Sequence, residues 1–137
     1  MKEASWEECV EYNSAKKVSP NLERADSLRG VAEERIGIIK EITLKNCNFV
    51  FEDYYTSLLE LLQALIIQRG YKILNHICLG YFLRDVLKED RLYNLFDDLR
   101  YKRNSLTYYG NKMDFETAKQ SIENSKTLMK ELEFYLK

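Results

Sequence analysis

Apolar residues recur at intervals of three and four along most of the chain, which is the spacing of amphipathic helices. The clearest stripe follows Ser19-Pro20, a pair typical of a helix N-terminus, and ends near Lys45-Asn46. Its members are Leu22, Ala25, Leu28, Ala32, Ile36, Ile39 and Ile42. The pattern therefore predicts one long helix that continues to about residue 46.

A second helix is expected over residues 51–69, and its composition sets it apart from the others. Its apolar residues lie on most sides of the helix rather than on one stripe, and they are Leu58, Leu59, Leu61, Leu62, Leu65, Ile66 and Ile67. A helix that is apolar nearly all round belongs in the middle of a bundle. Gly70 follows it directly and is a suitable residue for a helix C-terminus.

The rest of the chain also has helical patterns. We expect a short first helix at about residues 5–17, a helix over residues 73–87 and a helix over residues 91–109 that Gly110-Asn111 terminates. Asp114 is placed to cap a last helix. No strand, internal repeat or linker is evident. We therefore expect one all-α domain over residues 1–137, an up-and-down bundle of four or five helices, with residues 1–18 as an extra N-terminal helix.

Composition supports this fold and limits the function. The chain has one Pro and 5 Gly in 137 residues, so long uninterrupted elements are favoured. The net charge of −1 indicates that any electrostatic binding site is local. The longest apolar-rich stretch, residues 58–67, is about half of the ~20 residues that a membrane span needs. With a charged N-terminus that lacks an apolar core, the sequence suggests a soluble cytoplasmic protein.

The cysteines and the single histidine do not form a recognisable site. Cys9, Cys47 and Cys78 are odd in number, far apart in the sequence and without a C-x-x-C pair, so we expect reduced thiols rather than a disulfide or a zinc site. His76 lies among apolar residues, which is typical of a core or interhelical position. In the alternative, His76 faces a cleft and acts as a substitute base. No metal or cofactor is expected.

Cations and aromatic residues alternate at the end of the helix expected over residues 91–109. The segment reads Arg100-Tyr101-Lys102-Arg103-Asn104-Ser105-Leu106-Thr107-Tyr108-Tyr109-Gly110. Arginine binds phosphate with paired hydrogen bonds, and tyrosine rings stack on bases. We therefore expect Arg100, Lys102, Arg103 and Tyr109 to bind a nucleotide or RNA.

Helix geometry limits which of these side chains cooperate. Asn104 and Tyr108 are four residues apart and share a face. Arg103 and Tyr108 are five apart, roughly 140° around an ideal helix, so we do not expect them to converge unless the helix end unwinds or a second protomer completes the site. In the structural alternative, Arg103 and Asn104 cap carbonyl groups, and the tyrosines are half-buried bundle residues.

The segment from Arg103 to Tyr108 resembles the R-x4-6-H motif of HEPN domains (higher eukaryotes and prokaryotes nucleotide-binding). The arginine, the polar Asn104 and the four-residue spacing match, and so do Tyr109-Gly110, the short polar turn and the long last helix. The resemblance covers about residues 51–137. The histidine of the motif is replaced by Tyr108.

Membership of this family implies a metal-independent ribonuclease, often a toxin that a small nucleotidyltransferase neutralises, and a homodimer with two motifs across a shared cleft. By this analogy Arg103 binds phosphate, Asn104 orients it and Tyr108 occupies the place of the catalytic base. Tyrosine ordinarily titrates near pH 10 and histidine near 6.5, so the replacement favours binding with weak or lost cleavage.

Two further hypotheses remain open from the sequence. One is an active metal-independent endoribonuclease that uses Arg103, Asn104 and Tyr108. The other is a non-enzymatic scaffolding bundle whose cleft docks a protein. A carboxylate-bound metal site is disfavoured, because adjacent acidic pairs point about 100° apart on a helix and the chain lacks E-x-x-H pairs.

Overall fold

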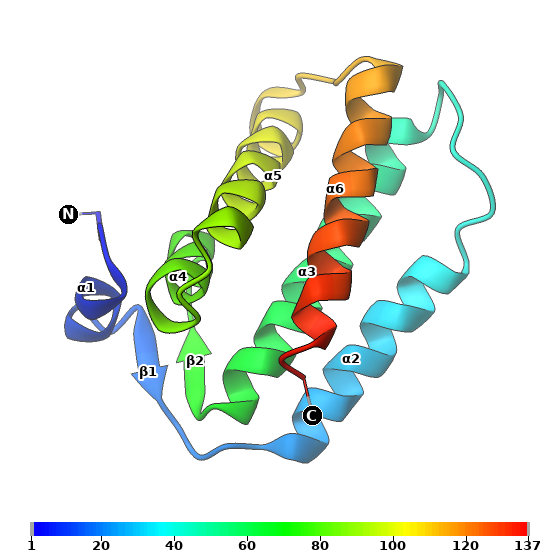
Figure 1. Ribbon diagram of the computed structural model, residues 1–137. Helices are drawn as coiled ribbons and strands as arrows, with labels where there is room; N and C mark the ends of the chain where they lie inside the picture. Colours follow the sequence, from blue (N-terminus) through cyan, green and yellow to red (C-terminus); the bar gives the residue numbers. More distant parts are fainter. Residues whose placement is uncertain (1, 137) are drawn as a thin grey trace.

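The computed structural model describes residues 2–136 and is an all-α bundle with a small two-stranded sheet at one end (Figure 1). The elements in chain order are α1 (Trp6–Glu11), β1 (Ala15–Lys17), α2 (Leu22–Gly37), α3 (Cys47–Gln68), β2 (Tyr71–Ile73), α4 (His76–Tyr81), the π-helix η1 (Phe82–Val86), α5 (Asp90–Tyr109) and α6 (Phe115–Glu133). The long helices α2, α3, α5 and α6 form the bundle, and the short elements lie beside the end of the bundle where α3 ends and α5 begins. Within the described residues, no helix combines the length and apolarity needed to cross a membrane.

Helix α3 forms the centre of the bundle, as its composition predicts. It contributes thirteen buried residues, which lie on most of its circumference: Cys47, Asn48, Val50, Phe51, Tyr54, Tyr55, Ser57, Leu58, Leu61, Leu62, Ala64, Leu65 and Ile66. Helices α2 and α6 pack along it, and α5 contacts it through the stacked rings of Tyr55 and Phe96, whose centroids are 6.0 Å apart. Because α3 is covered in this way, the other long helices need bury only one face each.

Helix α2 is shorter than its apolar stripe suggests. It begins at Leu22, where the Asn21 side chain accepts a hydrogen bond from the Arg24 backbone N–H, and ends at Gly37. The prediction that it reaches residues 45–46 is wrong. Ile39 and Ile42 keep the helical spacing, yet they pack half-buried against the core from a loop. For Ile39 and Ile42 the apolar spacing therefore predicted burial correctly and backbone conformation incorrectly, whereas Leu22, the first residue of the stripe, is 59% exposed.

A short antiparallel sheet replaces the end of the first predicted helix and occupies the connection before the helix expected over residues 73–87. Ala15 pairs with Ile73 and Lys17 with Tyr71, so β1 and β2 close the end of the bundle. The expectations of a helix to residue 17 and of no strand are both wrong. Strands of three residues are too short to show a period-two pattern. Gly70 adopts a φ of +82° at the turn, where a Cβ would lie 2.9 Å from the Val18 carbonyl oxygen.

The helix expected over residues 73–87 is also divided. Asn75 caps α4 by accepting a hydrogen bond from the Cys78 backbone N–H at 2.9 Å, and a π-helix follows directly. The break expected at residues 88–90 is confirmed, since Lys88 has a φ of +61°. The end of α5 and the start of α6 are confirmed as well: Gly110 terminates α5 in the left-handed region, and Asp114 caps α6.

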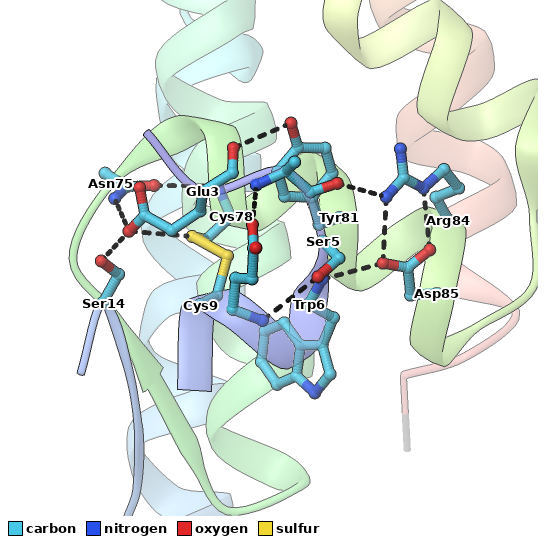
Figure 2. The surroundings of a disulfide bond; sticks show 12 residues. Glu3, Ser5, Trp6, Cys9, Ser14, Asn75, Cys78, Tyr81, Arg84 and Asp85 are labelled. Carbon is cyan, nitrogen blue, oxygen red and sulfur yellow. Dashed lines mark hydrogen bonds and ion pairs between the residues drawn. A yellow bond between two sulfur atoms is a disulfide. The ribbon is translucent and has the colours of Figure 1, made fainter. Parts of the chain in front are cut away.

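A disulfide joins Cys9 of α1 to Cys78 of α4, which corrects the expectation of reduced thiols (Figure 2). The cysteines are 69 positions apart, and their Cα atoms are 6.0 Å apart because α1 packs on α4. Spacing in the sequence gave no sign of this pairing. A cross-link that closes a loop of this length stabilises a protein by about 4 kcal/mol in the chain-entropy account. Cys47 remains a free, buried thiol.

Candidate functional site

One face of α5 and the first turn of α4 enclose an open groove of about 310 Å³. From α5 come Arg100, Asn104 and Tyr108, which are spaced by four residues and therefore lie on one face. The facing wall is the segment from Asn75 to Ile77, which includes His76. The groove thus brings part of the cation–aromatic segment together with a histidine that lies more than twenty positions earlier in the chain.

Arg103 is half-buried and does not itself line the groove, but it contacts Asn104 and Tyr108, which do. Its guanidinium carbon lies 5.7 Å from the centre of the Tyr55 ring and 5.9 Å from that of Tyr108. One of its nitrogens is 3.5 Å from the Asn104 side-chain oxygen, at the limit of a hydrogen bond. Within residues 2–136, Arg103 forms no ion pair with a carboxylate. The guanidinium is therefore held by aromatic rings, and its charge is available to a ligand.

The expectation that Arg103 and Tyr108 do not converge is wrong. An angle of about 140° between Cα positions is correct for a regular helix, and α5 is regular up to Tyr109. The long arginine side chain and the large tyrosine ring nevertheless span the angle along the helix surface. No unwinding of the helix and no second protomer is needed for this contact.

The remaining predicted ligand-binding residues are placed differently from one another. Arg100 lines the groove, and its guanidinium donates two hydrogen bonds, of 2.8 and 3.1 Å, to the Asp97 carboxylate. Lys102 pairs with Asp98 at 2.7 Å and does not line the groove. Tyr109 is 78% exposed at the helix end, outside the groove lining.

Tyr108, the residue in place of the motif histidine, is also in the open. It lines the groove and is 68% exposed, so one ring face is free for contact with a ligand. The alternative in which the two tyrosines are half-buried bundle residues does not match this exposure. An exposed aromatic ring at a groove suits stacking against a nucleobase.

His76 lines the same groove and also forms an interhelical contact, which agrees with the interhelical position expected from the sequence. Its Nδ1 atom lies 3.3 Å from the hydroxyl of Tyr55, a residue of α3 that is 1% exposed. Within residues 2–136, Nε2 has no hydrogen-bonding partner. Partial burial, and then the charges of Arg103 and Arg100, lower the pKa of His76 below its ordinary 6.5. The imidazole is therefore neutral at pH 7, the state in which one ring nitrogen can accept a proton.

Tyr55 is a site residue that sequence reasoning missed. It contacts His76 by its hydroxyl, Phe96 by stacking and Arg103 by its ring face. Burial raises its pKa, so the hydroxyl stays protonated at neutral pH. The sequence carries no signal for this role, because Tyr55 looks like any other aromatic residue of a buried helix.

The side chains of the groove combine three kinds of chemistry. Two guanidinium groups favour an anion, the exposed Tyr108 ring favours a planar base, and a neutral imidazole accepts or donates a proton. The chemical pattern fits a phosphodiester with a nucleobase. A metal site is not part of it: the one cluster of three potential ligands within residues 2–136 is Glu3, Cys9 and Cys78, where the two sulfurs are bonded to each other.

Comparison with known proteins places the chain in no family. No protein-family model, no curated protein and no solved structure matches it.

The charge of Arg103 is expected to act on His76 in a measurable way. In an Arg103→Gln variant, the pKa of His76 rises toward 6.5 but stays below it, because burial is the larger cause of the shift. His76 is the only histidine, so its ring signals can be followed without ambiguity in a proton–carbon NMR titration. Lys102→Gln is the matched control and leaves the pKa unchanged. An unchanged pKa in both variants would place the Arg103 charge away from the imidazole.

Proposed function

We propose that this protein is a HEPN-like RNA- or nucleotide-binding protein whose ligand lies in the groove between α4 and α5. The observation that carries the proposal is the Arg103 guanidinium, which is held over Tyr55 and Tyr108 without an acidic partner in residues 2–136 and stands beside an open groove. A guanidinium in that setting binds phosphate oxygens with two parallel hydrogen bonds.

Each wall of the groove has a defined part in this proposal. Arg103 holds the phosphate, and Arg100 adds a second charge that Asp97 partly neutralises. Asn104, 3.5 Å from Arg103, orients the phosphate with its amide. The exposed ring of Tyr108 stacks on a base, which every nucleobase permits because each has a planar face. Binding of this kind prefers single-stranded RNA and depends weakly on sequence.

Lys102 and Tyr109 lie beyond the groove lining, and we assign them a secondary part. A strand that leaves the groove past the exposed end of α5 meets the Tyr109 ring first. Lys102 is paired to Asp98 and contributes mainly to the local field. Neither residue is required for the primary phosphate contact.

The resemblance to HEPN proteins adds a biological setting to the proposal. It implies a toxin–antitoxin-type pair with a minimal nucleotidyltransferase and a homodimer, and the cytoplasmic location expected from the sequence is kept as part of the proposal. The homodimer in this setting comes from the resemblance alone. A disulfide in a protein of the cytoplasm is more often redox-sensing than permanent.

A second candidate function, metal-independent RNA cleavage, is favoured by the position of His76. When Nδ1–H donates to the Tyr55 hydroxyl, Nε2 has a free lone pair to take the proton of a ribose 2′-hydroxyl. The 2′-oxygen then attacks phosphorus, the bond to the 5′-oxygen breaks, and a 2′,3′-cyclic phosphate forms while the leaving oxygen takes up a proton. Arg103 and Arg100 offset the charge that develops on the phosphate.

Removal of the Arg103 guanidinium tests the binding proposal. Arg103→Ala is expected to weaken binding of a labelled single-stranded oligoribonucleotide by roughly 10- to 100-fold, the equivalent of one charged hydrogen-bonding group. Fluorescence anisotropy at constant salt measures the affinity. Lys102→Ala removes the same charge from the same helix outside the groove and changes the affinity by no more than about threefold. Equal losses in both variants would show that only net charge matters.

Cleavage is tested with the same RNA in excess EDTA. His76→Gln is expected to slow the reaction by about 10²- to 10⁴-fold, the usual contribution of a general base, while Tyr108→Phe keeps most of the rate. The acidic limb of the pH–rate profile should lie below pH 6.5, because the pKa of His76 is lowered. Product analysis should find 2′,3′-cyclic ends. Intact RNA with the wild-type protein would leave binding as the function.

The oligomeric state is accessible to light scattering. A homodimer is expected at micromolar concentration, and it should persist in Arg103→Ala because that change removes a ligand contact and leaves the helices intact. A monomer under these conditions contradicts the paired arrangement. Co-purification of a partner protein with no nucleic acid would instead favour the scaffolding hypothesis.

A further inference from the structure

The Cys9–Cys78 disulfide lies directly behind the wall of the groove that carries His76. Both sulfur-bearing residues are 0% exposed, and the bond ties the N-terminal segment, residues 2–14, to α4 (Figure 2). Cys78 is the third residue of α4 and follows His76 by two positions. Any change in how α4 is anchored at Cys78 is therefore passed to the groove within one helical turn.

Asn75 connects the N-terminal segment to the groove by a second route. Its side-chain oxygen caps α4 by accepting from the Cys78 backbone N–H at 2.9 Å, and its side-chain nitrogen donates to the Glu3 carboxylate at 3.3 Å. Ser14 also donates to this carboxylate. The carboxylate lies 3.8 Å from Cys78 Sγ, which is a packing contact because an oxidised cysteine has no S–H to donate. Asn75 itself lines the groove.

Helix α4 depends on such outside anchors. It has six residues, and a helix of that length is not stable alone. Its C-terminal side is fixed by close packing, since a Cβ on Gly80 would lie 3.2 Å from the Tyr93 ring. Its N-terminal side, where His76 lies, is held by Asn75 and the disulfide, by the His76 contact with the Tyr55 hydroxyl at 3.3 Å, and by the Leu74 backbone N–H, which donates to the Ser14 carbonyl at 2.8 Å. The fixed and the releasable ends of α4 are thus distinct.

We infer that the Cys9–Cys78 disulfide is a redox-controlled clamp on the groove: oxidation holds Asn75 and His76 in the groove wall, and reduction releases them. A dithiol reductant supplies the two electrons. Its thiolate attacks one sulfur, the protein S–S bond breaks, and closure of the reductant to a cyclic disulfide leaves two protein thiols. The link to ligand binding rests on the function proposed above, whereas the mobility of α4 does not.

The N-terminal segment keeps other contacts after reduction, which is why we expect a local response. The Trp6 backbone N–H donates to Asp85 at 2.8 Å, and the Trp6 ring packs edge-on against Phe82 at 5.5 Å between centroids. Arg84 donates to the Ala4 carbonyl at 3.0 Å. These contacts all involve η1, which follows the end of α4 remote from the groove. The chain therefore stays folded while residues 74–78 become mobile.

Hydrogen–deuterium exchange on the oxidised and the dithiol-reduced protein tests the clamp, with mass spectrometry confirming the redox state. Reduction is expected to speed amide exchange in residues 74–79 by about tenfold or more at short labelling times, before the most protected amides of α2 and α6, which exchange through global unfolding, respond. Cys9→Ser should match the reduced protein with or without reductant. Cys47→Ser is the matched control, since it removes the free thiol and keeps the response. Equal exchange at residues 74–79 in both redox states overturns the clamp.

The link to the groove is tested by anisotropy with the same oligoribonucleotide. Reduction is expected to weaken binding several-fold in wild type and in Cys47→Ser but not in Cys9→Ser. Faster exchange with unchanged RNA affinity overturns control of the groove. If exchange responds to reduction but neither redox state binds RNA, the proposed function fails while the redox-dependent mobility of α4 stands.

Discussion

Burial of α3 on most of its circumference is the constraint on which the rest of the structure depends. A helix of 22 residues with thirteen buried positions cannot lie at a surface, so other helices must surround it. Helices α2, α5 and α6 do so with one face each. Because α5 buries only Leu92, Phe96, Leu99 and Leu106, its other faces stay free to carry charged and polar groups.

The groove exists because one face of α5 is buried and another face is left free. The buried face fixes the helix to α3, and the face that carries Arg100, Asn104 and Tyr108 meets α4. Tyr55 connects the core with the groove, because its ring is part of the core and its hydroxyl contacts His76, which lines the groove. A local cationic site can therefore exist on a chain whose net charge is −1, and the charge total says little about its ligand.

The short elements determine where the α4 wall of the groove lies. The sheet of β1 and β2, the disulfide and the Glu3 carboxylate bring the N-terminal segment against α4. Without these anchors a helix of six residues is too short to be stable and would not keep His76 opposite α5. Stability and the candidate chemistry are thus connected through the same few contacts, which is why a redox change at a buried bond bears on the groove.

The sequence by itself determined the helical class, the central place of α3, the end of α5, the start of α6 and the cation–aromatic segment, because apolar periodicity and caps such as Asp114 and Gly110 are local properties of the chain. Only the tertiary structure decided the end of α2, the sheet, the disulfide and the position of His76. Each of these depends on contacts between residues far apart in the chain, and neither Cys9 and Cys78 nor His76 and Arg103 carry a local signal of their meeting. Periodicity reports which residues are buried, whereas the partners against which they are buried are set when the whole chain packs.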